Sequence, residues 1–284
     1  MRLSIITINF NNRDGLRKTI ESVVNQTWQE FEYIIIDGGS TDGSVDVIKE
    51  YADRIDYWVS ERDKGIYHAM NKGVAAAHGE YLLFLNSGDE LADRNILQQV
   101  CNKLCGVDII MGLVRVVPSN RIAYTDVEYP LRFQHFYLGC PVPHPASFIR
   151  AHLFEKHMYD ENYKIVSDWK FFLQTIILEN CSYTTINEII TNFKEGGISD
   201  ARYACEEERR EILMDLIPPR ILIDYQKSLT GFGYDETAYD LFFVRLRNYK
   251  YKKIIYTISV ILVKFISCFR PSAKTFRKFP YFTK

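Results

Sequence analysis

The 284-residue sequence lacks the phosphate-binding motifs of several common enzyme classes. No GxGxxG follows the first apolar segment, where NFNNRDG (residues 9–15) stands instead, and no GxxxxGK(S/T) occurs anywhere. The first absence argues against a dinucleotide-binding dehydrogenase. A nucleotidyltransferase, which also uses a metal on an α/β sheet, would need a glycine-rich, basic phosphate loop after the first strand, and none is present.

Paired cysteines and a membrane-length apolar run are also missing. The six cysteines show no CxxC spacing, which disfavours zinc ribbons and thioredoxin-like redox sites and fits free thiols in a reducing compartment. The N-terminal MRLSIITINF is typical of a buried strand rather than a signal peptide. We therefore predict a cytoplasmic protein, either free or peripheral on the inner face of the cell membrane.

Acidic residues are absent from the C-terminal segment Leu241–Lys284, which carries eleven of the 35 Lys and Arg residues. The rest of the chain holds the other 24 basic residues and all 36 acidic ones. The apolar run Ile254–Phe269 is shorter than the roughly 20 residues that span a bilayer, and Lys264 interrupts it. We predict that Ile254–Phe269 forms an amphipathic helix at a membrane interface, and that basic residues of the segment 245–284 hold it to the anionic surface. The alternative is a helix packed back on the body of the protein.

Apolar, β-branched segments alternate with helix-like segments through the first hundred residues. Strands are predicted at Leu3–Ile8, Tyr33–Ile36, Ile55–Val59 and Tyr81–Leu85. This order favours a largely parallel sheet covered on both faces, with ligands outside the carboxyl ends of its strands. Beyond it, a helix is predicted at Asp168–Leu178, and shorter strands are predicted at Asp108–Met111, Val114–Val117, Arg121–Tyr124, Ala146–Ile149 and Tyr183–Ile190. The Pro218–Pro219 pair marks the expected boundary between domains 1–217 and 218–284.

Two acidic loops directly follow predicted strands. DGGSTDGS begins at Asp37, and NSGD occupies Asn86–Asp89. Carboxylates repel phosphate unless a cation lies between them, so these loops could hold a metal and a phosphorylated ligand. Asp89 is the one firm ligand for Mg²⁺ or Mn²⁺, with Asn86 as a neutral oxygen donor. In isolation the loop at Asp37 is equally typical of a simple turn, and the loop Asn86–Asp89 is more typical of a turn than of a metal site.

Four segments, in this order, carry a resemblance over about residues 1–200: LSIITINFNN, ESVVNQTWQEFEYIIIDGGSTDGS, DKGIYHAMNKGVAAAHGEYLLFLNSGDE and KIVSDWKFFLQ. Together they resemble family-2 glycosyltransferases, most closely bacterial enzymes that build O-antigen, capsule or exopolysaccharide. The resemblance implies a GT-A-type, Rossmann-like, mostly parallel α/β sheet with helices on both faces, followed here by a helical C-terminal tail. It also implies transfer of a hexosyl or N-acetylhexosaminyl group.

The resemblance also implies a site for the nucleotide-sugar donor. Asp37 takes the position of the base-binding aspartate, and Asp63 lies next to the nucleotide. The DxD-type metal element falls on Asn86–Asp89, but it keeps only one carboxylate, Asp89, where the family often has two or three. The expected donor-binding residues are Asn9, Phe10, Asp37, Gly38, Asp63, Asn86, Ser87, Gly88 and Asp89.

Asp168 resembles the family's acceptor-side acid, at the start of a helix. A sugar hydroxyl that attacks an anomeric carbon must lose its proton, and a positioned carboxylate can accept it. The alternative role for Asp168 is to cap its helix. Residues expected near the acceptor or the sugar are His144, Trp169, Gly196 and Gly197, although His144 between prolines is also typical of a structural histidine.

These expectations combine into an inverting glycosyltransferase. It would move a sugar from a nucleotide-sugar, most simply a UDP-sugar, to a hydroxyl of a glycan or a polyprenyl-diphosphate-linked acceptor in cell-surface polysaccharide synthesis. Because the loop Asn86–Asp89 keeps only one carboxylate, one alternative stays open: a non-catalytic nucleotide-sugar-binding or scaffold protein of a membrane assembly. We predict no nucleic-acid partner.

Overall fold

The computed structural model describes residues 2–125, 130–197 and 202–229. The chain divides into two units, Met1–Leu216 and Ile217–Lys284. In the second unit the described part is the helix α9 (Pro219–Leu229), which begins at the Pro218–Pro219 pair. The predicted membrane-facing tail, residues 245–284, lies outside the described residues.

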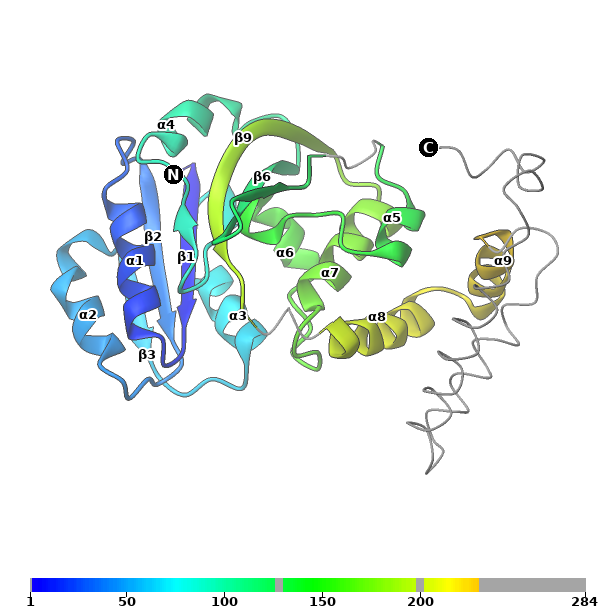
Figure 1. The fold of residues 1–284 in the computed structure, drawn as a ribbon, viewed down its shortest axis with the longest axis horizontal. Helices are drawn as coiled ribbons and strands as arrows, with labels where there is room; N and C mark the ends of the chain where they lie inside the picture. The colour runs from blue at the N-terminus through cyan, green and yellow to red at the C-terminus, as the bar shows by residue number, and fades with distance from the viewer. Residues whose placement is uncertain (1, 126–129, 198–201, 230–284) are drawn as a thin grey trace, which may run out of the picture. The chain divides into compact units, whose positions relative to one another are not determined.

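The N-terminal half of the first unit is a parallel sheet. Its strands are β1 (Leu3–Asn9), β2 (Phe31–Asp37), β3 (Tyr57–Ser60) and β4 (Tyr81–Phe84). They stand in the order β3-β2-β1-β4, so β1 is central and pairs with both β2 and β4. In this register Asn9 lies opposite Asp37, at the carboxyl edge of the sheet. The loops after β1, β2 and β4 therefore meet at that edge (Figure 1).

The sheet then continues with mixed pairing. The order β4-β8-β6-β9-β5 is antiparallel except for the β6–β9 pair, and β7 attaches to β6. These strands are β5 (Glu90–Leu91), β6 (Ile109–Val117), β7 (Arg121–Ala123), β8 (Ser147–Arg150) and β9 (Tyr183–Lys194). The long, bent β9 passes beside the carboxyl edge of the parallel half (Figure 1).

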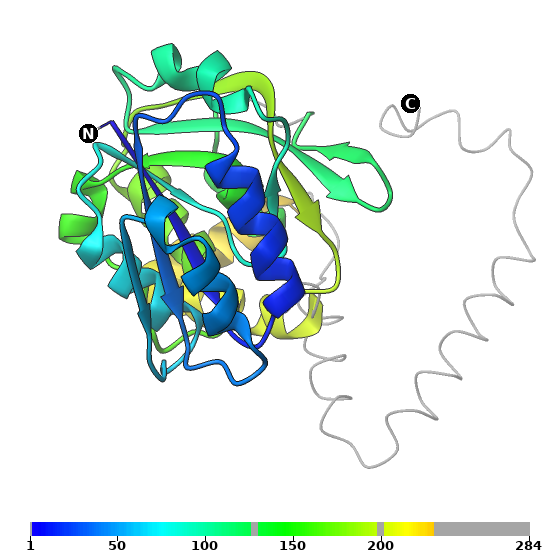
Figure 2. The same cartoon turned by 90° about the vertical axis from the view of Figure 1, so that its left-hand side faces the viewer.

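Helices cover both faces of the parallel strands because these strands are apolar on both sides. Leu3 and Ile5 pack with Leu16 and Ile20 of α1, whereas Ile6 meets Gly73 of α3. A methyl group on Gly73 would come within 2.4 Å of Ile6, so glycine permits this close packing. Figure 2 shows α1 and α2 in front of the sheet. The remaining helices of the unit lie toward the mixed half, and the full set is α1 (Arg13–Val24), α2 (Ser44–Glu50), α3 (Ile66–Ala76), α4 (Ile96–Val100), α5 (Phe133–Leu138), α6 (His152–Lys156), α7 (Ser167–Phe172) and α8 (Arg202–Leu216).

The predicted fold class, an α/β sheet that is mostly parallel in its first half, is confirmed. Three local predictions differ. The two strands expected at Asp108–Met111 and Val114–Val117 are one strand, β6, which continues through a shift of register at Gly112. The expected helix Asp168–Leu178 is α-helical only in α7 and continues as a π-helix over Leu173–Leu178. Strand β9 runs four residues beyond the predicted end at Ile190.

Within the described residues no helix is both long and apolar enough to cross a membrane. The five cysteines in this part of the chain, Cys101, Cys105, Cys140, Cys181 and Cys205, form no disulfide bond.

Candidate active site

A cavity of about 510 Å³ lies where the carboxyl edge of the parallel sheet meets the mixed half. Asn86 and Asp89 line it from the loop after β4, and Asp168 and Trp169 line it from α7. Arg209 of α8 also contributes to the wall. The structure thus gathers residues that are far apart in the sequence around one cavity. Two of the four predicted acidic site residues, Asp89 and Asp168, are among them.

The loop after β4 is held in shape by helix α1. The Thr19 hydroxyl donates to the carbonyl oxygen of Asp89 (2.7 Å) and accepts from the Gly88 N–H (2.9 Å). The Asn12 amide donates to the carbonyl oxygen of Ser87 (2.9 Å). Gly88 has a φ of +107°, a conformation that side chains other than glycine rarely adopt. Three backbone groups of the loop are therefore held by hydrogen bonds from α1 and its N-cap, and the loop presents Asn86 and Asp89 to the cavity.

Asp89 is a desolvated carboxylate with little support from the protein. Its residue is only 6% exposed, and among the described residues the one donor to its side chain is the Lys194 N–H, at 3.2 Å. Burial raises the pKa of the Asp89 carboxyl to about 7, and this single hydrogen bond only partly offsets that rise. A nearby cation would favour the ionised form, so the position suits a metal ligand.

The donor set also fits a hard divalent cation. Asn86 adds a second oxygen to the same cavity, because its buried Oδ1 has no hydrogen-bond partner. The described residues contain no cluster of three or more Asp, Glu, His or Cys side chains that could form a complete metal cage. Mg²⁺ and Mn²⁺ suit oxygen ligands, and Mg²⁺ commonly binds through one or two carboxylates together with substrate phosphates and water. The site is therefore suited to an ion that arrives with a phosphorylated ligand.

Asp168 lies in the first turn of α7, and its side chain does not cap the helix. The N-cap position is Val166, and no side-chain capping bond is present, so the capping alternative is wrong. The Tyr67 hydroxyl of α3 lies 2.9 Å from Oδ1 of Asp168 and 2.6 Å from the carbonyl oxygen of Ile165, and it shares its one proton between them. Burial and the adjacent Asp168 charge raise the pKa of Tyr67 well above its usual value, which keeps this hydroxyl a donor.

Glu208 of α8 fixes the segment that leads into α7. Its carboxylate accepts hydrogen bonds from the backbone N–H groups of Lys164 (2.9 Å), Ile165 (2.9 Å) and Val166 (3.1 Å). Three donors on one carboxylate hold the turn immediately before Asp168. Helix α8 thereby positions the start of α7.

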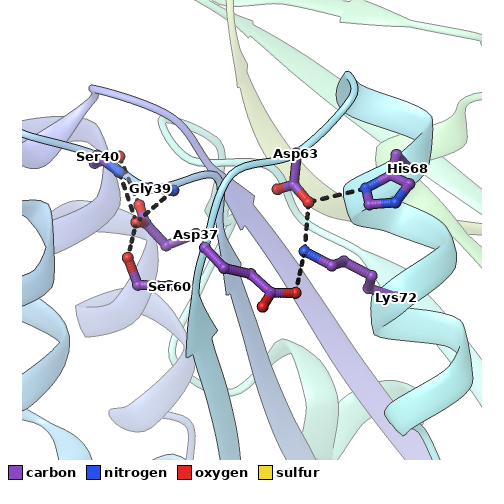
Figure 3. A network of polar contacts seen from close by, with 8 residues as sticks. Asp37, Gly39, Ser40, Ser60, Asp63, His68 and Lys72 are labelled. Carbon is purple, nitrogen blue, oxygen red and sulfur yellow. Dashed lines mark hydrogen bonds and ion pairs between the residues drawn. The ribbon is translucent and has the colours of Figure 1, made fainter.

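The carboxylate of Asp37 has a very different environment. It is fully buried and accepts from the Ser40 hydroxyl (2.6 Å), the Ser60 hydroxyl (2.6 Å) and the N–H groups of Gly39 and Ser40 (Figure 3). It also accepts from the Asn9 amide (2.7 Å). Burial acts to raise the pKa of Asp37, but these hydrogen bonds outweigh it and hold the pKa below its usual range. Asp37 lies outside the lining of the cavity and shapes the loop after β2.

Phe10, Gly38 and Asp63 lie together beside Asp37, at the ends of β1 and β2. The Phe10 ring is 66% exposed, and a methyl group on Gly38 would come within 3.1 Å of this ring and 3.3 Å of Asp63 Oδ2. Asp63 uses its other oxygen for His68 (3.0 Å) and Lys72 (2.6 Å), as Figure 3 shows. Its Oδ2 atom is buried without a hydrogen-bond partner. Phe10, Gly38 and Asp63 thus surround one spot with a flat apolar face and a free acceptor.

The residues expected near the acceptor have mixed placements. His144 lines the cavity but is buried, stacks on Phe84 and pairs with the Tyr159 hydroxyl at 2.8 Å. Burial lowers the pKa of His144, against the opposing effect of Asp168, so the ring is a neutral part of the wall. Trp169 also forms wall, with its indole N–H donating to the Gly139 carbonyl (2.8 Å). Gly196 and Gly197 are exposed after β9 and outside the cavity lining; the rest of that predicted loop, residues 198–199, lies outside the described residues.

Sequence reasoning missed Arg209 and Glu208. Both belong to the run EEERRE (residues 206–211), in which charged residues at every position conceal the two that face inward. A helical projection anchored on the buried residues Cys205 and Ile212 would have placed both nearer the packed side than Arg210.

The fold is that of the GT-A glycosyltransferases. TarS from Staphylococcus aureus in complex with UDP-GlcNAc matches with a TM-score of 0.60 and 15% identity over 84% of this chain and 78% of that one. The mannosyltransferase PcManGT from Pyrobaculum calidifontis, solved with GDP-Man and Mn²⁺, matches with a TM-score of 0.54 and 14% identity over 92% and 85%. At these identities the similarity shows the fold alone.

The sequence gives the family. Residues 4–157, more than half of the chain, match the profile described as Glycosyl transferase family 2. An uncharacterized glycosyltransferase of Mycobacterium tuberculosis is 34% identical over 208 residues, which cover 70% of this chain and 78% of that protein. A PGL/p-HBAD biosynthesis glycosyltransferase of Mycobacterium bovis is 27% identical over 213 residues, with coverages of 69% and 78%. The chain belongs to glycosyl transferase family 2.

Proposed function

We propose that this family-2 glycosyltransferase is an inverting enzyme that transfers a hexosyl or N-acetylhexosaminyl group from a UDP-sugar to a glycan hydroxyl. The observation that carries the proposal is the shared cavity of Asp89 and Asp168. Glycosyl transfer needs one acidic group that holds a cation beside the leaving diphosphate, where negative charge develops. It needs a second acidic group that accepts the proton of the acceptor hydroxyl. The cavity supplies both from different elements.

The nucleoside is proposed to bind at Phe10, Gly38 and Asp63. The exposed Phe10 ring offers a face for a base, and Gly38 leaves room beside it. The unpartnered Oδ2 of Asp63 can accept one N–H, which the N3–H of uracil provides and cytosine lacks at the same ring position. Asp37 supports this position through Asn9 and the loop after β2, rather than through an unoccupied acceptor of its own. The UDP-GlcNAc complex of TarS adds support for a uridine donor.

Asn86 and Asp89 are proposed to hold Mg²⁺ or Mn²⁺ together with the donor diphosphate. Ser87 and Gly88 contribute the backbone that presents them, and Thr19 holds this backbone in place. When bound, the cation offsets the negative charge that develops on the leaving nucleoside diphosphate. The Mn²⁺ in the PcManGT complex is consistent with this assignment.

Asp168 is proposed to be the catalytic base. It accepts the proton of the acceptor hydroxyl as that oxygen attacks the anomeric carbon from the face opposite the leaving group. The donation from Tyr67 occupies one side of Oδ1 and restricts the orientation of the carboxylate. A single displacement of this kind inverts the anomeric configuration, and the buried walls of Trp169 and His144 keep water from the reacting centre.

The acceptor is proposed to be a glycan or lipid-linked glycan of the cell surface. The PGL/p-HBAD biosynthesis relative supports a role in assembling surface glycans. The acidic body and the basic segment 241–284 support a peripheral position on an anionic membrane, with 1–217 as the catalytic domain and 218–284 as the extension. Flotation of the full chain with anionic vesicles, compared with a chain ending at Asn248, tests this position. Equal flotation of the two chains would contradict the proposed membrane position.

A donor panel tests the proposed reaction. UDP release from UDP-GlcNAc, UDP-GalNAc, UDP-glucose and UDP-galactose is measured with and without Mn²⁺, alone and with a mixture of lipid-linked and free glycans. We expect Mn²⁺-dependent release that a glycan accelerates, together with a product of inverted configuration. Binding of donor without any release would instead support the non-catalytic scaffold.

A further inference from the structure

Arg209 is a cation of the active-site wall that none of the steps above uses. It lies on α8 and lines the cavity that Asp89 and Asp168 also line. Its guanidinium carbon is 5.8 Å from the centre of the Trp169 ring, and its buried Nε atom has no hydrogen-bond partner. The side chain is thus oriented by an aromatic face and retains an unused donor.

Two carboxylates of α8 interact with groups outside their own helix. Glu208 accepts three backbone N–H groups of the segment 164–166, and Asp215 lies 4.0 Å from Lys170. A buried donor without a partner is destabilising because it has lost its hydrogen bonds to water, and the loss is larger when the group is charged. An anionic ligand would satisfy that donor, and guanidinium groups bind carboxylate and phosphate through two parallel hydrogen bonds.

The position of α8 indicates which substrate would carry the anion. The nucleoside-binding loops follow β1, β2 and β3, whereas α7 and α8 lie on the side of the unit away from α2 and β3 (Figure 1). Arg209 stacks on Trp169, the residue directly after the proposed base, and so belongs to the acceptor side. The donor diphosphate already has the cation site at Asp89. An anionic acceptor would also be repelled by the Asp168 carboxylate unless a cation stood nearby.

We propose that Arg209 binds an oxyanion of the acceptor, a carboxylate or a phosphate close to the hydroxyl that is glycosylated. This inference rests on the proposed function and narrows it to acidic or phosphorylated glycans. Arg209 is then a specificity-determining residue, and Trp169 is the platform that orients it.

A direct binding experiment uses the full chain saturated with UDP and Mg²⁺. Inorganic phosphate and sodium glucuronate are titrated separately while tryptophan fluorescence is recorded, because Trp169 lies against the guanidinium. We expect a saturable change with at least one of the two anions, absent in Trp169→Phe, about tenfold weaker in Arg209→Gln and partly restored in Arg209→Lys. Arg210→Gln, an exposed neighbour on the same helix, is the matched control and should match the wild type. No response to either anion would overturn the proposal.

A kinetic experiment separates the acceptor from the donor. Two pairs of acceptors are used, each with a neutral and a charged member. One pair is p-nitrophenyl glucoside and p-nitrophenyl glucuronide, and the other is glucose and glucose 6-phosphate. We expect Arg209→Gln to lower the preference for the charged member of each pair about tenfold, mainly through KM. An equal loss for charged and neutral acceptors, or a rise confined to the donor KM, would contradict the inference. So would a shifted pH profile with unchanged preference, because Arg209 would then act through Asp168.

The two proposals fail separately. If the wild-type chain releases no UDP from any donor, the glycosyltransferase mechanism fails, whatever Arg209 binds. If UDP release occurs and Arg209→Gln leaves both the anion titration and the acceptor preference unchanged, only the role of Arg209 fails.

Discussion

Asp37 begins the loop after β2, and Asp89 ends the loop after β4. The two loops lie on either side of the central strand β1, and the surroundings of the two carboxylates are opposite. Asp37 is fully buried and receives five hydrogen bonds, whereas Asp89 is almost as buried and its side chain receives one. The pKa of Asp37 is held below its usual range, and that of Asp89 is raised to about 7 by burial. Two acidic loops that look alike in sequence therefore differ in what they can do.

The difference shows that the supply of donors decides the role of a buried carboxylate. Where the protein supplies hydrogen-bond donors to both carboxylate oxygens, the carboxylate stabilises the conformation of its loop. Where the protein leaves them unsatisfied, the carboxylate needs a cation or a proton. Asp168 is an intermediate case, since it is partly exposed, lines the cavity and accepts a hydrogen bond from the Tyr67 hydroxyl.

The largest effect is expected at Asp168. Asp168→Asn keeps the shape of the side chain but cannot accept the acceptor proton, so kcat should fall by about 10²–10⁴-fold. Donor binding, measured by calorimetry with UDP and Mn²⁺, should change little. The exposed Asp215→Asn on α8 is the control. Unchanged turnover in Asp168→Asn would refute its role as the base.

The next effect concerns stability and compares the two carboxylates, Asp37 and Asp89, directly. Asp37→Ala leaves buried donors of Asn9, Ser40 and Ser60 without an acceptor, and the free energy of unfolding should fall by about 2–4 kcal/mol. Asp89→Ala removes a poorly solvated charge and should change it by about 1 kcal/mol or less at pH 8. Urea unfolding of the metal-free proteins measures both. A larger loss for Asp89→Ala would reverse the comparison.

The pH dependence of metal binding sharpens the account of Asp89. Because its folded pKa is about 7, protons compete with Mn²⁺ at this carboxylate, and the apparent affinity should fall up to tenfold for each pH unit below about 7. Calorimetry with Mn²⁺ and UDP between pH 5 and 8 measures this slope. Asp89→Asn should bind the metal weakly at all of these pH values, and an equal slope in that variant would place the titrating group elsewhere.

The same pKa gives a signed prediction for stability without metal. The ordinary pKa of the carboxyl is 3.8, so between about pH 4 and 7 the folded protein holds a proton that the unfolded chain has lost. The free energy of unfolding should therefore decrease as the pH rises through this window. The decrease should be smaller in Asp89→Asn, which has nothing to titrate there. A wild-type curve that rises relative to the variant would contradict the burial of an unpaired Asp89.

The smallest effect is expected at Glu208, which acts on Asp168 through the segment 164–166. Glu208→Gln keeps part of the hydrogen bonding, and kcat should fall about threefold to tenfold with little change in the donor KM. Glu207→Gln, on the outer side of the same helix, is the comparison variant. A matching loss in both would show that helix charge, rather than the three backbone bonds, matters.

The sequence predicted the parallel half of the fold well, because four short apolar segments alternate with helical patterns and leave few topologies open. It also named Asp89 and Asp168, which fold into one cavity; their roles as the metal-side and acceptor-side acids stay predictions. It did not distinguish Asp37 from Asp89, because the donors around Asp37 come from three separate segments that meet only after folding. The strand β6 was divided at Gly112 because a glycine in a strand resembles a break.

Arg209 and Glu208 were missed for a related reason. Their significance depends on which side of α8 packs against α7, and a run of charged residues gives a weak apolar signal for that side. The functional difference between Arg209 and Arg210 is therefore a property of the assembled cavity.

A crystal structure of the full chain with UDP and Mn²⁺, with the metal located by anomalous scattering, tests the central claim most directly. The account predicts Mn²⁺ bound to the Asp89 carboxylate and the UDP diphosphate, uracil between Phe10 and Asp63, and Asp168 facing the vacant acceptor side. Mn²⁺ bound away from Asp89, or a nucleotide whose diphosphate does not reach the cavity shared with Asp168, would contradict it.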